Sequence, residues 1–65
     1  MYVIQFKERG VETNVWSGYV DYSEALRAVR DADLIIPPNW TWDIITEEKL
    51  AQQYEEEYYQ KIETA

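Results

Sequence analysis

The chain has 65 residues, and its 13 acidic residues outnumber its 6 basic residues, which gives a formal net charge of -7. It contains no cysteine and no histidine, which excludes disulfides, thiolate nucleophiles, thiolate zinc sites and the usual base near neutral pH. A chain this short builds one core and leaves little for a walled active-site pocket. We therefore expect a single acidic domain that is not an enzyme and has no catalytic residues, metal site or cofactor.

The start of the chain, Met1 to Phe6, shows no basic leader. No apolar run approaches the ~18 residues that a membrane span needs. The absence of cysteine suits a reducing compartment. We predict a cytoplasmic protein with no membrane partner.

Residues 2–7 alternate in the period of a half-buried strand, with Tyr2, Ile4 and Phe6 on one face. Gly10 can adopt the positive φ that a short hairpin turn requires. A second strand is expected at about 12–20. Strict alternation there places Trp16 and Tyr19 on opposite faces.

A helix is predicted to begin at Asp21, because Asp21 and Glu24 have the spacing of a capping box. In that arrangement the Asp side chain accepts a hydrogen bond from a backbone donor and the Glu side chain reaches back. The apolar stripe of this helix comprises Tyr22, Ala25, Leu26, Val29 and Ala32. We place its end near Asp33 or Leu34, ahead of the prolines Pro37 and Pro38.

Asn39 to Ile45 is predicted to be a third strand, with Trp40, Trp42 and Ile44 on one face. The fold class is then α+β, a small two-layer domain in β-β-α-β-α order, with a three-stranded sheet packed by a helix. Residues 1–65 form a single domain, comprising a sheet-and-helix core (1–45) and an acidic C-terminal helix (46–65). If the second and third strands are parallel, a right-handed crossover places the first helix across one face of the sheet.

Thr46 is a candidate cap for the last helix, followed by glutamates in its first turn. The inner stripe of this helix is narrow and tyrosine-rich: Leu50, Ala51, Tyr54, Tyr58 and Ile62. The outer face carries Glu48, Gln52, Glu55, Glu56, Tyr59 and Glu63. Glu57 and Lys61 have the four-residue spacing of a helical ion pair.

The net negative charge lies in the second half of the chain. Residues 1–30 have a net charge of zero, and residues 31–65 carry the whole -7. The acidic outer face has two interpretations: a solvated surface, or a surface that imitates the charges of a nucleic acid and competes for a basic groove. The three tryptophans are expected to be mainly core, although one of Trp16, Trp40 and Trp42 could be an exposed anchor.

The middle of the chain consists of a capped helix containing Ser23 to Leu26, then two prolines, then the aromatic strand Trp40 to Ile45. This layout resembles that of small acidic bacteriophage host-takeover proteins. This type includes anti-CRISPR proteins and inhibitors of host RNA polymerase. The similarity lies in size, acidity, aromatic richness and layout, without a diagnostic motif. It implies a phage-encoded, non-enzymatic blocker that binds one host protein in the host cytoplasm.

The leading hypothesis is a protein-binding inhibitor that blocks a host nucleic-acid-handling complex. Its partner would be a host protein with a basic nucleic-acid-binding groove, and the chain would bind no nucleic acid directly, as a monomer or homodimer. The predicted partner-binding residues are Glu48, Glu55, Glu56, Tyr59, Glu63 and Trp42. The alternative is an assembly module that homodimerises through a strand edge or exposed aromatics. A carboxylate-only enzyme is the third interpretation, which the small size disfavours.

Overall fold

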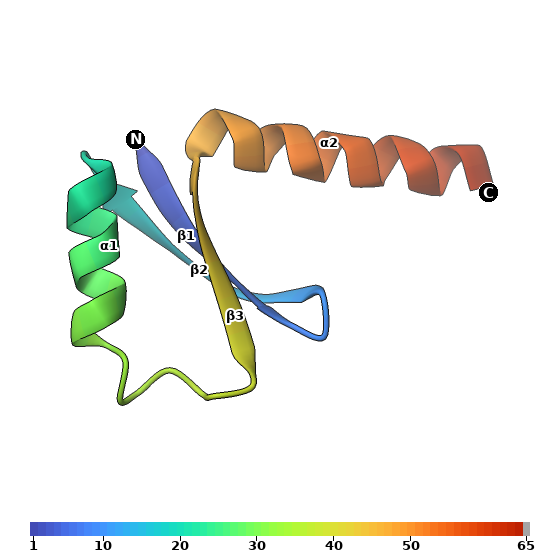
Figure 1. Ribbon diagram of the computed structural model, residues 1–65. Helices are drawn as coiled ribbons and strands as arrows, with labels where there is room; N and C mark the ends of the chain where they lie inside the picture. Colours follow the sequence, from blue (N-terminus) through green and yellow to red (C-terminus); the bar gives the residue numbers. More distant parts are fainter. Residues whose placement is uncertain (65) are drawn as a thin grey trace.

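The computed structural model describes the backbone of residues 1–64 and the side chains of residues 1–58. The elements follow one another as β1 (Tyr2–Glu8), β2 (Val11–Tyr19), α1 (Tyr22–Asp31), β3 (Trp40–Thr46) and α2 (Glu47–Thr64) (Figure 1). The predicted α+β class and β-β-α-β-α order are therefore confirmed.

The three strands form one antiparallel sheet in the order β2-β1-β3. β1 is the central strand, and its residues Val3 to Phe6 are all buried between the two layers that cover the sheet. The two edge strands are each antiparallel to β1, so they run parallel to each other with β1 between them. The connection through α1 therefore joins two parallel strands that are not neighbours.

The β1–β2 hairpin closes through a two-residue turn, since Glu8 pairs with Val11. Arg9 and Gly10 both have positive φ, of 53° and 78°. Two consecutive positive φ values are the geometry of a type I′ turn, whose twist matches that of the flanking strands. The sequence-based prediction assigned a positive φ only to Gly10, and the structure shows a positive φ at Arg9 as well.

A β-bulge interrupts the alternation of β2. Tyr2 pairs with Tyr19 and Ile4 pairs with Trp16, so a step of two residues along β1 corresponds to a step of three residues along β2. Gly18 lies in this extra step with φ of 94°, a conformation that glycine adopts without steric cost. Trp16 and Tyr19 consequently pack against the same core cluster. The prediction that they lie on opposite faces was wrong because it assumed strict alternation.

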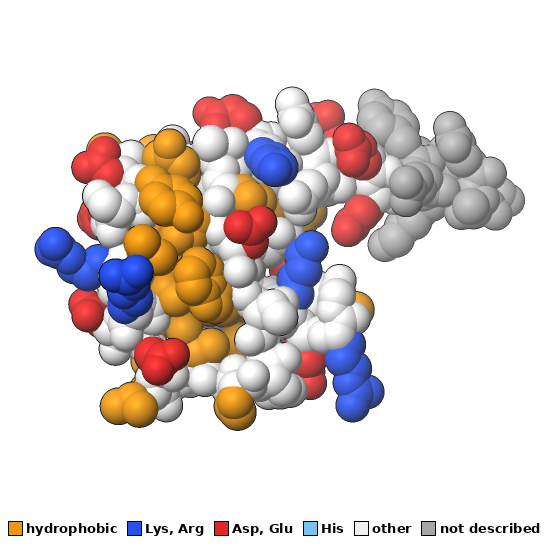
Figure 2. Space-filling view, in the orientation of Figure 1, with side chains coloured by type: hydrophobic (Ala, Val, Ile, Leu, Met, Phe, Trp, Pro, Cys, Tyr) orange, Lys and Arg blue, Asp and Glu red, His pale blue; other side chains and the backbone are white. Residues whose placement is uncertain are grey.

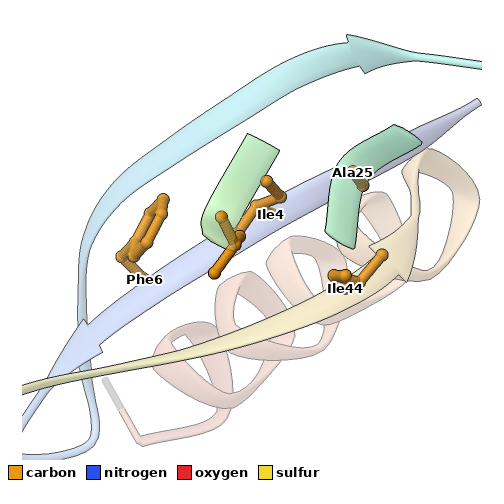
Figure 3. Close-up of a cluster of buried hydrophobic side chains, with 5 residues drawn as sticks. Ile4, Phe6, Ala25 and Ile44 are labelled. Atoms are coloured by element: carbon orange, nitrogen blue, oxygen red, sulfur yellow. The ribbon is translucent and has the colours of Figure 1, made fainter. Parts of the chain in front are cut away.

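The sheet buries apolar side chains on both faces. On one face, α1 closes a cluster of buried side chains, Ile4, Phe6, Ala25, Val29 and Ile44. Figure 3 labels four of them, which come from β1, α1 and β3. The Phe6 ring lies 4.7 Å from that of Trp16 and 5.9 Å from that of Trp40, between centroids. On the other face, the first part of α2 contributes Leu50 to a smaller cluster with Val3 and Ile45.

The predicted helix caps are partly confirmed. At α1, Glu24 Oε2 accepts a hydrogen bond from the Val20 backbone N–H at 3.2 Å. Asp21 occupies the N-cap position, but its side chain makes no capping hydrogen bond. At α2, Thr46 Oγ1 accepts from the Lys49 N–H at 3.2 Å, as expected. Glu24 therefore reaches back as predicted, but to the residue before the N-cap, and the capping box itself is not formed, whereas the threonine cap is present.

The helix α1 ends at Asp31, earlier than the predicted Asp33 or Leu34. The Ala32 carbonyl accepts hydrogen bonds from the N–H groups of Ile35 and Ile36, at 2.9 and 3.0 Å. The chain therefore turns out of the helix at Ala32, so the helix ends before the positions that Pro37 and Pro38 restrict.

Candidate protein-interaction surface

Among the described residues, α2 makes its buried apolar contact with the sheet near its start. Leu50 is 9% exposed and packs against Val3 and Ile45. Ala51 is exposed, and Tyr54 and Tyr58 are 44% and 63% exposed. Figure 1 shows the reason: α2 runs on past the edge of the sheet. Among the described residues of the predicted inner stripe, only Leu50 is buried, and Ile62 lies outside the described side chains.

A polar cluster clasps the middle of α2 to the sheet. The Tyr54 hydroxyl donates a hydrogen bond to Glu12 Oε1 at 2.8 Å. The Gln5 side-chain amide donates to the same Glu12 oxygen and to Gln53 Oε1, each at 3.1 Å. Gln5 is 5% exposed, so these bonds satisfy a polar group that would otherwise be costly to bury. In this way one carboxylate on β2 links β1 and α2.

The clasp alters the acidity of Tyr54. Burial of its hydroxyl, the hydrogen bond to Glu12 and the negative charges of Glu12 and Glu57 raise the pKa of Tyr54 to about 12. Each of these effects disfavours the phenolate, because the anion would be less hydrated and would face carboxylates. Tyr54 is therefore a neutral hydrogen-bond donor across the physiological range.

The sequence did not reveal this clasp. Its one available signal was Gln5, a polar residue between the apolar Ile4 and Phe6 of the first strand. Nothing in the pattern around Glu12 indicated a contact with a residue 42 positions later.

A groove of about 370 Å³ opens between the hairpin and α2. Its lining comprises Gln5, Lys7, Gly10, Val11, Glu12, Gln53, Tyr54 and Glu57. Lys7 brings a cation among the carboxylates of Glu12 and Glu57, so the groove has mixed charge. The groove therefore differs in chemistry from the predicted acidic outer face of α2.

The acidic outer face is represented in the described residues by Glu48, Glu55 and Glu56, which are all exposed. At ~1.5 Å of rise per residue, Glu55 lies about 10 Å further along the helix axis than Glu48. Figure 2 shows acidic side chains distributed over α2. Within residues 1–58, none of these carboxylates forms an ion pair or a hydrogen bond. They are available to an external cation.

Two further predicted contact residues, Tyr59 and Glu63, have side chains outside the described residues. The predicted Glu57–Lys61 ion pair also falls there, because the Lys61 side chain is not described.

Trp42 is the exposed tryptophan that the sequence anticipated. It is 42% exposed on β3, opposite Phe6, whereas Trp16 and Trp40 pack against the core. Trp42 alternates with Ile44 and so lies on the face that α1 covers, while α2 packs on the other face. The structure therefore does not bring Trp42 together with the glutamates of α2.

The loop between α1 and β3 carries a feature that the sequence prediction missed. Leu34 and Ile35 are 98% and 77% exposed. The available signal was their position after the last residue of the α1 stripe and ahead of the prolines.

The fold is thus a small α+β domain with a three-stranded antiparallel sheet and two helices. Comparisons with protein-family models, with curated proteins and with solved structures find no match. None of the helices in the described residues is long and apolar enough to cross a membrane.

Proposed function

We propose that this protein is a non-enzymatic inhibitor that binds a host protein by presenting the acidic face of α2 to a basic nucleic-acid-binding groove. The observation that carries the proposal is the exposure of Glu48, Glu55 and Glu56 without a cationic partner among residues 1–58. The resemblance to phage host-takeover proteins supplies the class of partner, a bacterial nucleic-acid-handling complex.

The arrangement of α2 supports this mode of binding. The helix has 18 residues, which at ~1.5 Å per residue gives a rod about 27 Å long. It projects beyond the sheet in Figure 1, so a partner can approach the exposed side of the rod without meeting the core domain. A carboxylate-bearing rod of this length can occupy a groove that is shaped for a nucleic-acid strand.

The net charge of -7 supports fast association. Opposite charges on the two surfaces steer diffusional encounter, and salt screens this attraction. Binding should therefore weaken as the salt concentration rises. A nucleic acid that occupies the same groove should displace the protein.

The test begins with affinity capture from a bacterial lysate and mass spectrometry, at low and high salt, to identify the partner. Binding of the purified partner is then measured for a variant that combines Glu48→Gln, Glu55→Gln and Glu56→Gln. The expected result is about 100-fold weaker binding, since each of the three lost charge-assisted contacts costs on the order of 1 kcal/mol. The dependence of affinity on salt should also become shallower.

A matched control changes the same amount of charge elsewhere. Asp21, Asp31 and Asp33 are exposed, lie in or beside α1 and accept no side-chain hydrogen bond. Their replacement by asparagine should leave the affinity within about twofold, apart from the weak long-range screening effect. Equal losses in the two triple variants would indicate a net-charge effect and contradict a specific acidic face. Unchanged binding in the α2 variant would refute the proposal directly.

A further inference from the structure

The open sheet has two edge strands, β2 and β3. Edge strands present unpaired backbone N–H and C=O groups, which can pair with a strand of another molecule. The hydrogen bonds of this protein show which outward-facing backbone N–H groups of the two edges already have an acceptor within the chain.

The hydrogen-bond phase of the sheet identifies the backbone groups that face outward from β3. The Glu47 N–H donates to the Met1 carbonyl at 3.0 Å, which continues the β1–β3 ladder by one pair. Because bonded and non-bonded pairs alternate in an antiparallel ladder, the odd-numbered residues of β3 bond to β1. The N–H groups of Trp40, Trp42 and Ile44 therefore point away from the sheet.

Two of these three outward donors are already occupied. Asp43 Oδ1 accepts from the N–H of Ile44 at 3.0 Å. The Pro37 carbonyl accepts from the N–H of Trp40 at 3.1 Å. Within the described residues, the Trp42 N–H is left without a partner. The Asp43 side chain thus occupies the middle of the β3 edge.

The β2 edge carries the same device. Asn14 Oδ1 accepts from the N–H of Val15 at 2.9 Å. Gln5 pairs with both Val15 and Asp43, and its backbone groups bond toward β3, so the Val15 N–H also points away from the sheet. The two capped amides, those of Ile44 and Val15, therefore lie opposite neighbouring β1 residues, Ile4 and Gln5, on opposite edges of the sheet.

We propose that Asp43 and Asn14 are edge caps that prevent a second copy of this chain from adding its strand to the sheet. An incoming strand would have to place a carbonyl at the Ile44 or Val15 N–H, where a side-chain oxygen already sits. Such an oxygen both occupies the donor and repels the carbonyl. The caps close the edges to the strand-edge form of homodimerisation.

The two edges depend on their caps to different extents. β2 also has two register shifts, between Tyr2 and Ile4 and between Phe6 and Lys7 in β1 numbering, and bulges discourage strand addition. β3 pairs with β1 in unbroken register over its whole length. Asp43 is therefore the more important cap.

The decisive experiment compares Asp43→Val with Asp43→Asn. The valine removes the acceptor oxygen and the charge, whereas the asparagine removes the charge and keeps the acceptor. By light scattering after size exclusion, up to millimolar concentration, the wild-type protein and Asp43→Asn should be monomeric. Asp43→Val should form dimers whose fraction rises with concentration. Adding Asn14→Val to Asp43→Val should open the second edge and yield larger assemblies. The single substitution Asn14→Asp, which keeps an acceptor oxygen, should leave the protein monomeric.

Three outcomes would overturn the proposal. They are a dimeric wild-type protein, an Asp43→Val variant that remains monomeric, and an Asp43→Asn variant that associates as strongly as Asp43→Val. The last result would assign the effect to charge repulsion instead of the occupied donor.

Amide hydrogen exchange gives a second measurement that does not depend on association. In dilute wild-type protein, the Ile44 and Val15 amides should exchange about tenfold more slowly than the outward Trp42 amide, the factor that corresponds to about 1.4 kcal/mol of hydrogen bonding. In Asp43→Val, the Ile44 amide should exchange as fast as that of Trp42, while the buried ladder amides of β1 report an intact fold. Equal exchange of Ile44 and Trp42 in the wild-type protein would contradict the cap.

Discussion

Replacing Tyr54 by phenylalanine tests the clasp that joins α2 to the sheet. The change removes the hydroxyl that donates to Glu12 Oε1 at 2.8 Å and keeps the ring. Glu12 retains its hydrogen bond from Gln5, so no carboxylate is stranded. We expect the free energy of unfolding to fall by about 1 kcal/mol.

The magnitude follows from the loss of one hydrogen bond, which contributes about 1 kcal/mol net. The Tyr54 side chain is 44% exposed, so solvent keeps the contribution at this modest level. It is still a substantial part of the stability of a 65-residue domain. The rise of the pKa of Tyr54 from 10.0 to about 12 reports how strongly burial and the nearby carboxylates disfavour the phenolate, and it therefore governs the stability at high pH.

The effect should depend on pH with a definite sign. The folded-state pKa of Tyr54 lies above its unfolded value, so the stabilisation by the neutral hydroxyl is fully present below pH 10. As the pH rises from 10 to about 12, the unfolded state loses its proton first and the stabilisation disappears. The stability difference between the wild-type protein and Tyr54→Phe should therefore shrink over this range.

The assay is urea unfolding of both proteins, followed by far-ultraviolet circular dichroism, in steps from neutral pH toward pH 12. The other tyrosines are common to both proteins, so their ionisation cancels in the difference. Tyr22→Phe is the matched control, because Tyr22 is 52% exposed and its hydroxyl makes no hydrogen bond in the described residues. It should change stability by less than about 0.5 kcal/mol. Equal stability of Tyr54→Phe and wild type at neutral pH would refute the reasoning.

Two further substitutions test the packing of α2 and the bulge of β2. Leu50→Ala should lower the free energy of unfolding by about 2 kcal/mol, because Leu50 is the side chain through which α2 enters the second core cluster; urea unfolding measures this, and a loss below about 0.5 kcal/mol would show that the clasp alone holds the helix. Gly18→Ala should cost about 1 to 2 kcal/mol in thermal or urea unfolding, because φ is 94° and an added Cβ meets no atom within 4 Å, so the cost is conformational. A neutral Gly18→Ala would contradict the assignment of the bulge.

The sequence-based prediction of α2 was accurate for its start and inaccurate for its packing. Thr46 and the glutamates after it are local signals, since a cap and a charged first turn act within one turn of the helix. The prediction of an inner stripe from Leu50 onward assumed that the sheet would cover these side chains along the whole helix. Beyond Leu50 the helix meets polar side chains of the sheet, so Tyr54 is held by a hydrogen bond to Glu12 and remains 44% exposed.

The acidic candidate residues were predictable for a related reason. Glu48, Glu55 and Glu56 are exposed as expected, because charged side chains on a helix remain in water unless a partner compensates for their burial. Trp42 was correctly one of the candidates for exposure, but its position relative to the glutamates depends on which face of the sheet each helix covers. That choice follows from the packing of Ala25 and Leu50 on opposite faces.

The sequence by itself determined the order of elements, the apolar face of the first strand, and the location of the net negative charge. These properties depend on local periodicity, turn residues and composition, which act over a few neighbouring positions. Only the tertiary structure decided that Trp16 and Tyr19 share a face, that Glu12 meets Tyr54, and that Asp43 and Asn14 cap opposite edges. Those features depend on register and strand order, and one extra residue in a ladder redirects the side chains that follow it.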